Sequence, residues 1–311
     1  MLNDLSEIIR QKCHEAGFIK TGFAKAEKLT AESASLQEWL HEKRNADMQW
    51  MNNSFEKRTD PSLIMDDVRS IISLAYVYDT PIAHSEDKNI PKISRYAWGS
   101  RDYHKVLKKI LKELCTDIEL LSPHIKTKFY VDDGPVMDKA WAVRSGIGWM
   151  GKNTNIIDPD SGSFFFLSTI LINQELEYGK PIEDLCKTCM LCVNECPTGA
   201  IYEEYKVDAN LCISYHTIEN RGSIPDEIDL EGWIFGCDVC QDVCPYNGKN
   251  IFTDNVNFFP RRELTESTYS ELREMSEENF NLVFSGTPVK RTKYSGWIRN
   301  ISQAEKKIKK I

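Results

Sequence analysis

The chain has 311 residues, of which 41% are hydrophobic, 10% aromatic and 28% charged, and its net charge is −8 at pH 7. This length suggests one large or two modest domains, and the composition provides for a sizeable core in a soluble protein. The most apolar run, Phe164 to Ile172, has nine residues, which is far short of a membrane span. Met1 to Gln11 carries three charged residues and no apolar stretch, so no export signal is predicted.

Hydrophobic periodicity predicts a mixed body up to about residue 175. We expect helices at residues 2–17, 30–45, 104–121 and 135–145. We expect strands at residues 70–78, 126–131, 155–157 and 164–173. Cys13 and Cys115 fall on or beside the apolar faces of two of these helices, and we interpret both as small core residues. The mixture of elements indicates an α/β or α+β fold.

A glycine pattern follows the fourth predicted helix. Gly146-Ile-Gly148-Trp-Met-Gly151 fits the G-x-G-x-x-G pattern of dinucleotide-binding loops. Such a loop should follow a strand and open a helix, whereas this one follows a helix and precedes a strand. We therefore predict no dinucleotide site and expect the glycines to mark a close approach of the backbone to a cofactor or a packed neighbour.

Eight of the ten cysteines lie within the 59 residues from Cys186 to Cys244. The first four follow the C-x2-C-x2-C-x3-C-P pattern of bacterial ferredoxins, whose fourth cysteine ligates the neighbouring cluster. A second run ends at Cys244-Pro245 but has Ile234 where its first cysteine should stand, and Cys212 is the nearby cysteine left to replace it. The spacing predicts two [4Fe–4S] clusters, one on Cys186, Cys189, Cys192 and Cys244 and the other on Cys196, Cys212, Cys237 and Cys240.

Two other uses of clustered cysteines are known. Cys-x2-Cys pairs also build structural zinc sites, but consecutive two-residue gaps with Cys-Pro endings favour iron–sulfur. Clustered thiols in a chain without a predicted export signal are typical of the reducing cytoplasm, so we expect a cytoplasmic protein rather than a disulfide framework.

The C-terminal part becomes polar and then basic. We expect one helix at residues 269–284. Residues from Thr287 to Ile311 carry eight Lys or Arg against Glu305 alone, so this end has a net charge of +7 and the remainder −15. A basic end on an acidic body permits contacts with phosphates. The alternative is a solvated helical tail.

Several longer motifs share one resemblance. They are Ser94-Arg-Tyr96-Ala-Trp-Gly99, Val131-Asp132-Asp133-Gly134-Pro135, Ala142-Val-Arg144-Ser-Gly146-Ile-Gly148-Trp149-Met-Gly151-Lys152-Asn153-Thr154, Cys212-Ile-Ser214-Tyr215-His-Thr217-Ile218-Glu219 and Phe284-Ser-Gly286-Thr-Pro-Val-Lys290-Arg291. With them, the chain from about residue 5 to residue 300 resembles the epoxyqueuosine reductases. It resembles a short form, without the C-terminal helical-repeat extension that many members carry.

The resemblance implies an oxidoreductase that reduces the epoxide of epoxyqueuosine at the tRNA wobble position to queuosine. It implies base-off cobalamin, used as Co(I), with electrons supplied by the two clusters from an external low-potential donor such as a flavodoxin or ferredoxin. The implied architecture is an α/β (α+β) cobalamin-binding domain at residues 1–175, a ferredoxin-like two-cluster domain at 176–250 and a helical segment with a basic tail at 251–311. We expect a monomer that binds this tRNA and no membrane.

The resemblance also implies site residues. The family's proton donor falls at Asp132, although Asp133 departs from the small or hydroxyl residue usual there and leaves the assignment open by one position. The alternative for Asp132 is that it only caps the helix near Pro135. Cobalamin contacts are implied at Arg58, Tyr103, His104, Asp132, Lys152, Asn153, Asn155, Tyr215, Glu219 and Gly222.

Some of these residues have alternative interpretations. His104 also suits an ordinary position in the first turn of a helix, and Lys152 also suits a surface cation. Tyr215, Glu219 and Gly222 follow a cluster ligand and face either the cofactor or tRNA. Two functions compete with the leading one: a reductive dehalogenase-like reductase of small molecules, and a non-catalytic iron–sulfur electron-transfer protein. Cobalamin content separates the second of these from the other two functions.

Overall fold

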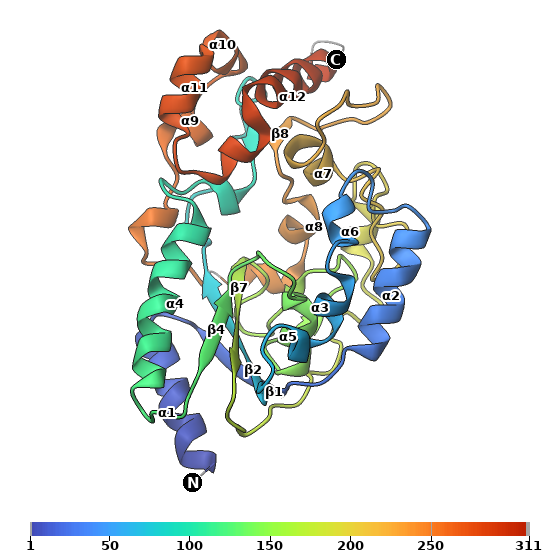
Figure 1. Cartoon of the computed structure of the whole chain (residues 1–311). Coiled ribbons are helices and arrows are strands. Elements are labelled where there is room, and N and C mark those ends of the chain that lie inside the picture. The colour runs from blue at the N-terminus through green and yellow to red at the C-terminus, as the bar shows by residue number, and fades with distance from the viewer. Residues whose placement is uncertain (1, 250, 309–311) are drawn as a thin grey trace.

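A four-stranded antiparallel sheet with the strand order β1-β2-β7-β4 organises the lower half of the molecule in Figure 1. The computed structural model describes residues 2–249 and 251–308. The strands are β1 (Lys20–Lys25), β2 (Ser70–Val77), β4 (Thr127–Tyr130) and β7 (Phe165–Ile172). All eight residues of β2 are buried, because β2 lies inside the sheet and both faces of the sheet are covered.

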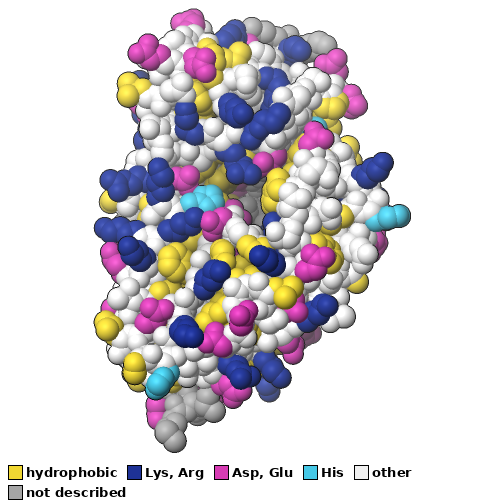
Figure 2. Space-filling view, viewed as in Figure 1, with side chains coloured by type: hydrophobic (Ala, Val, Ile, Leu, Met, Phe, Trp, Pro, Cys, Tyr) yellow, Lys and Arg dark blue, Asp and Glu magenta, His cyan; other side chains and the backbone are white. Residues whose placement is uncertain are grey.

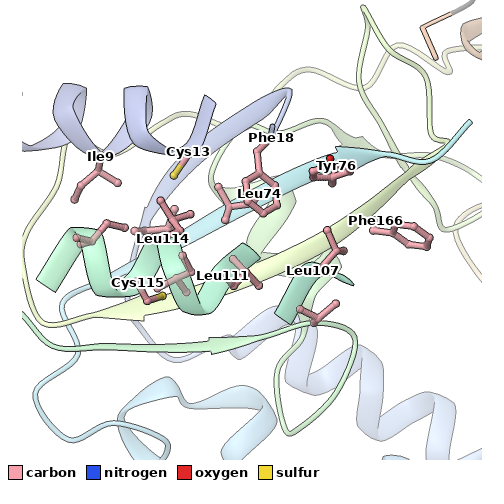
Figure 3. Packing of buried hydrophobic residues seen from close by; sticks show 14 of the residues in the cluster. Ile9, Cys13, Phe18, Leu74, Tyr76, Leu107, Leu111, Leu114, Cys115 and Phe166 are labelled. Atoms are coloured by element: carbon pink, nitrogen blue, oxygen red, sulfur yellow. The ribbon is translucent and has the colours of Figure 1, made fainter. Parts of the chain in front are cut away.

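The larger core lies between this sheet and the helices α1 (Leu2–Glu15) and α4 (Tyr103–Glu119), as Figure 3 shows. Side chains alternate across a strand, so Leu74 and Tyr76 of β2 reach this core together. Cys13 and Cys115 are buried there, which confirms that they are core residues. Burial raises the pKa of Cys13 to about 12 and that of Cys115 to about 11.

The opposite face of the sheet is covered by α5 (Asp138–Arg144), with Leu29 and Met65 from the connections packed beside it. Helices α2 (Thr30–His41) and α3 (Phe55–Thr59) contact each other on this side of the molecule. Trp141 of α5 packs with Ile71 and Leu171 of the sheet. The C-terminal end of α5 lies close to β1: a Cβ atom added at Gly22 would stand 2.3 Å from the carbonyl oxygen of Ser145. Only glycine therefore allows this approach.

A second core lies in the upper half of Figure 1 and is built mainly from the later part of the chain. It contains the fully buried tryptophans Trp98, Trp233 and Trp297. Its elements are β3 (Lys92–Ile93), β8 (Trp233–Phe235), α7 (Ile213–Ile218), α9 (Arg262–Thr265), α10 (Tyr269–Glu274), α11 (Glu277–Val283) and α12 (Lys293–Ile308). Because this core joins segments from residue 93 to residue 304, the predicted division at residues 175 and 250 stays a prediction.

Short elements carry the cysteine segments and the connections. They are the helices α6 (Leu191–Asn194) and α8 (Val239–Asp242) and the paired strands β5 (Trp149–Met150) and β6 (Ile156–Ile157). The 3-10 helices are Gln49–Met51, Pro61–Leu63, Arg95–Ala97, Pro245–Lys249, Val256–Phe258 and Pro288–Thr292. No helix in the described ranges is long and apolar enough to cross a membrane.

Helix α12 holds together two segments that carry cysteines. The fully buried side-chain amide of Asn300 donates to the carbonyl oxygens of Thr217 at 2.8 Å and Ile234 at 2.9 Å. Thr217 lies five residues after Cys212, and Ile234 lies three residues before Cys237. Trp297, Ile301 and Ala304 of the same helix are buried, so the prediction of a merely solvated tail is wrong for the part of α12 that is described. The side chains of Lys307, Lys309 and Lys310 lie outside the described residues.

Replacing Asn300 with alanine should destabilise the protein, because two buried carbonyl oxygens lose their donor and each unpaired group costs about 1–3 kcal/mol. We expect a lower thermal midpoint for the anaerobic protein, together with a loss of iron. Lys306→Ala, an exposed change on the same helix, is the matched control and should leave both values unchanged. Equal midpoints and equal iron contents for Asn300→Ala and the parent protein would contradict this role.

The predicted α/β (α+β) class is confirmed, and so are the main helices and strands of the first half. The single helix predicted at 269–284 is wrong: Ser276 caps a new helix through the backbone N–H of Asn279, so α10 and α11 are separate. The helix predicted at 30–45 ends at His41, and that at 135–145 begins at Asp138. Strand β1 and the short pair β3 and β8 were missed.

Candidate active site and cluster-binding segments

A hollow opens in the middle of the face shown in Figure 2, with apolar side chains in its walls and Lys and Arg side chains around its rim. Helix α4 begins and strand β4 ends at this level (Figure 1). Asp132 follows β4 in a left-handed conformation, with φ +48°, and its side chain is exposed. The buried hydroxyl of Tyr103 donates a hydrogen bond to Oδ2 of Asp132. The strained backbone and this bond together fix where the carboxylate points.

Tyr103 is itself held by stacking. Its ring lies between His104, with centroids 4.0 Å apart, and Phe166, with centroids 4.2 Å apart and an interplanar angle of 4°. Asp102 caps α4 by accepting from the backbone N–H of His104 at 2.9 Å, and Nδ1 of the same histidine lies 2.7 Å from the carboxylate. His104 thus occupies an ordinary first-turn position and also supports Tyr103.

The two adjacent aspartates have different surroundings. The carboxylate of Asp133 forms an ion pair with Lys108 at 2.5 Å and accepts a hydrogen bond from the backbone N–H of Val131 at 3.0 Å. Asp133 therefore stabilises the turn. Asp132 has the bond from Tyr103 instead. The prediction that Asp132 might only cap the following helix is wrong, because α5 starts at Asp138 after Met137 without a side-chain cap.

Two residues at the start of α5 were not singled out from the sequence. The exposed ammonium group of Lys139 donates to the carbonyl oxygen of Thr154 at 2.9 Å. The surrounding protein lowers its pKa by desolvation, while Asp132, Cys240 and Cys212 act in the opposite direction. Lys139 is therefore within electrostatic range of the Asp132 carboxylate and of two predicted cluster ligands.

Asp138 and Arg58 add opposite charges to the same region. Burial raises the pKa of Asp138 to about 7, with Asp132 adding to the effect. Burial lowers the pKa of Arg58, which Asp138 partly offsets. Nε of Arg58 is buried and has no hydrogen-bond partner among the described residues. An unpaired buried donor of this kind is a position for a bound polar group.

The cysteines fall into two sets, and within each set the thiols raise one another's pKa. The pKa of Cys192 is raised to about 11, first by burial and then by Cys186, Cys244 and Cys189. The pKa of Cys240 is raised, first by burial and then by Cys237, Cys212 and Cys196. These are the same two sets that the spacing predicts, and all ten cysteines are free thiols. No three His, Cys, Asp or Glu side chains in the described ranges are grouped to hold one metal ion, whereas a four-iron cluster spreads its thiolates more widely.

The glycine-rich turn packs against a neighbouring strand. A Cβ atom at Gly148 would lie 2.2 Å from the carbonyl oxygen of Ile157, and Gly146 has φ +77°. The residues that follow the turn contact cysteine segments: Lys152 donates to the carbonyl oxygen of Lys187 at 2.7 Å, and Asn153 to that of Cys240 at 3.0 Å. Lys152 is 2% exposed and 3.1 Å from Glu204, so its interpretation as a surface cation is wrong.

The remaining predicted contacts lie on α7 and just after it. The hydroxyl of Tyr215 is 3.2 Å from both the backbone nitrogen and the carboxylate of Asp47. Glu219 pairs with Arg291, with 3.0 Å between Nη2 and Oε2. Gly222 accepts at its carbonyl oxygen from Arg299 at 2.6 Å. These three residues are thus held by contacts inside the protein, and their role toward a cofactor or tRNA stays a prediction.

Comparisons with known proteins agree with one another. A family model described as epoxyqueuosine reductase QueG, DUF1730, matches residues 58–133, and a 4Fe-4S double cluster binding domain matches residues 185–247. The epoxyqueuosine reductase of Cellulophaga algicola is 42% identical over 298 residues, covering 95% of this chain and 96% of the relative. That of Synechocystis sp. is 43% identical over 269 residues, covering 85% and 92%.

Solved structures give the same result for the fold. A crystal structure of epoxyqueuosine reductase with an epoxyqueuosine-modified tRNA-Tyr stem loop superposes with a TM-score of 0.90 at 29% identity, covering 97% of this chain and 80% of that one. The Bacillus subtilis epoxyqueuosine reductase superposes with a TM-score of 0.88 at 28% identity, covering 97% and 81%. The predicted ferredoxin-like two-cluster domain is confirmed, and a non-catalytic electron carrier is excluded. This chain therefore belongs to the epoxyqueuosine reductase family of oxidoreductases.

Proposed function

We propose that this protein reduces the epoxide of epoxyqueuosine at the wobble position of tRNA to queuosine, using cobalamin and two [4Fe–4S] clusters. The observation that carries the proposal is that Lys139 donates to Thr154, whose neighbours Asn153 and Asn155 contact Cys240. Lys139 is also within electrostatic range of the Asp132 carboxylate and of Cys212 and Cys240. A proton donor and the end of an electron path are the two things that this reaction needs in one place. A solved relative binds a tRNA stem loop with the epoxyqueuosine modification, which supports the same substrate here.

We propose that the hollow holds a large polar cofactor. Arg58 offers a buried Nε with no partner in the described ranges, and Asp132 and Lys139 offer exposed polar groups. We propose that Arg58, Tyr103 and His104 contact cobalamin, as do Lys152, Asn153, Asn155, Tyr215, Glu219 and Gly222. Cobalamin bound there would supply a strongly reducing cobalt centre at which the carbon–oxygen bond of the epoxide opens.

The residues of the hollow then complete the reaction. Two electrons and two protons remove the epoxide oxygen as water and leave a carbon–carbon double bond. Asp132 gives a proton to the departing oxygen, a general acid step worth about 10²–10⁴ in rate. Tyr103 keeps the carboxylate aimed by its hydrogen bond. Lys139 places a positive charge next to Asp132, where negative charge develops on the oxygen.

The two cysteine sets give the electron path a direction. Cys212 and Cys240 act on the pKa of Lys139. We therefore propose that their set, which also contains Cys196 and Cys237, delivers electrons into the hollow. The set of Cys186, Cys189, Cys192 and Cys244 would receive them from an external low-potential donor such as a flavodoxin or ferredoxin. Lys and Arg side chains around the rim of the hollow would contact the phosphates of tRNA (Figure 2).

The test is a reaction of anaerobically reconstituted protein with epoxyqueuosine-containing tRNA and a low-potential reductant, with cobalamin either present or withheld. Digested nucleosides are measured by mass spectrometry. We expect loss of one oxygen mass only when cobalamin is present. No conversion by protein that holds about eight irons per chain would contradict the proposal and favour a reductase of small molecules.

A further inference from the structure

The side chain of Trp149 points at a predicted cluster ligand. Its indole Nε1–H donates to Sγ of Cys186 at a distance of 3.4 Å. Trp149 is 2% exposed and Cys186 is half-buried, so the donor of this hydrogen bond is shielded from water. The corresponding contact in the other cysteine set is longer: Nδ2 of Asn155 lies 3.9 Å from Sγ of Cys240. The two sets therefore differ in the side-chain donors that their sulfurs receive.

The position of Trp149 is fixed from two sides. In the paired strands β5 and β6, Trp149 lies opposite Ile157, and the glycine-rich turn allows the strands to approach. The ring of Tyr246 packs edge-on against Trp149, with centroids 4.8 Å apart and an interplanar angle of 79°. The hydroxyl of Tyr246 reaches the carbonyl oxygen of Leu185 at 3.5 Å. Trp149 thus lies between the segment of Cys186 and the segment of Cys244, two ligands of one predicted cluster.

We infer that Trp149 raises the reduction potential of the cluster held by Cys186, Cys189, Cys192 and Cys244. The inference rests on the proposed ligation of that cluster. Reduction adds negative charge that is shared with the thiolate sulfurs, and an N–H group aimed at one of them stabilises the reduced form more than the oxidised form. Trp149 is a positioning residue in this role, because it acts on the cluster through Cys186. The cluster that receives electrons from the external donor is thereby made easier to reduce.

The test is Trp149→Phe in the full chain, which removes the N–H group and keeps an aromatic ring. Anaerobically reconstituted protein is titrated with a low-potential reductant and monitored by electron paramagnetic resonance at controlled potential. We expect the midpoint potential of one [4Fe–4S] cluster to become more negative while that of the other stays in place. Tyr246→Phe is the matched control, because it keeps the ring that packs on Trp149 and the indole N–H group, and removes only the hydroxyl that reaches the carbonyl oxygen of Leu185.

Every outcome bears on the inference. Unchanged midpoints in Trp149→Phe, or an equal shift in Tyr246→Phe, would overturn it. If Trp149→Phe assembles with less iron, Trp149 is replaced with benzothienylalanine, which has the shape of tryptophan with sulfur in place of the N–H group, and a shift must then appear in that protein. Failure of the unaltered protein to hold two clusters would instead overturn the proposed ligation, and the inference with it.

Discussion

Replacing Asp132 with asparagine should lower the rate of epoxyqueuosine reduction by about 10²–10⁴-fold, because an amide has no acidic proton to give to the departing oxygen. The amide oxygen can still accept the hydrogen bond from Tyr103, so the turn after β4 should keep its shape. The measurement is the single-turnover rate with modified tRNA, in protein whose iron and cobalamin contents match those of the parent. Loss of cobalamin in this variant would show that Asp132 binds the cofactor and is not the proton donor.

Asp133→Asn is the matched control for this experiment. The carboxylate of Asp133 pairs with Lys108 and accepts a hydrogen bond from the backbone N–H of Val131, so it stabilises the turn. Lys108 is 43% exposed in this pair, and exposed ion pairs contribute little to stability. We expect a rate within a few-fold of the parent. The reverse pattern, with Asp133→Asn inactive and Asp132→Asn active, would move the proton donor by one position.

Replacing Cys212 with serine should remove one whole cluster. Cys212 is the ligand that lies outside both regular runs, and it shares the surroundings of Cys240 with Cys196 and Cys237. We expect the iron content to fall from about eight to about four per chain and turnover to fall to background, because the electron path to the hollow is interrupted. The measurement is iron analysis together with the reduction assay.

Ile234 provides a sharp second variant. A regular repeat of the cysteine pattern would place a thiolate at this position, but Ile234 is fully buried in the second core. The double change Cys212→Ser with Ile234→Cys should therefore fail to restore the missing irons. Restoration of eight irons in the double variant would show that position 234 can reach the cluster. Cys115→Ala, in the first core, should keep the full iron content.

Much of this site could be predicted because its signals are local in the sequence. The two-residue gaps between cysteines specify one turn each, so seven ligands follow from spacing, and Cys212 follows as the one nearby cysteine left over. The surroundings of Cys192 and Cys240 agree with the two sets. The core roles of Cys13 and Cys115 followed from helical periodicity in the same way. The cobalamin contacts came only from family resemblance, because no local pattern specifies that cofactor.

The rest depends on contacts between distant segments. Lys139 stands on a short helix whose pattern shows only which face is apolar, and its position beside Cys240 is set by the fold. Strand β1 has a weak pattern, because it contains Gly22 and forms the edge of the sheet. The break between α10 and α11 depends on whether Ser276 caps a helix or sits inside one, and composition does not distinguish these states.

The contacts of Asn300 also determine when the site can be completed during synthesis. Cys212 and Cys237 are both translated well before Asn300, the residue whose side chain joins the segments that carry them. Until α12 has folded, the segments with Cys212 and Cys237 are not joined by Asn300. We therefore expect the iron-loading machinery to fill the site of Cys196, Cys212, Cys237 and Cys240 only after α12 has been synthesised and has folded.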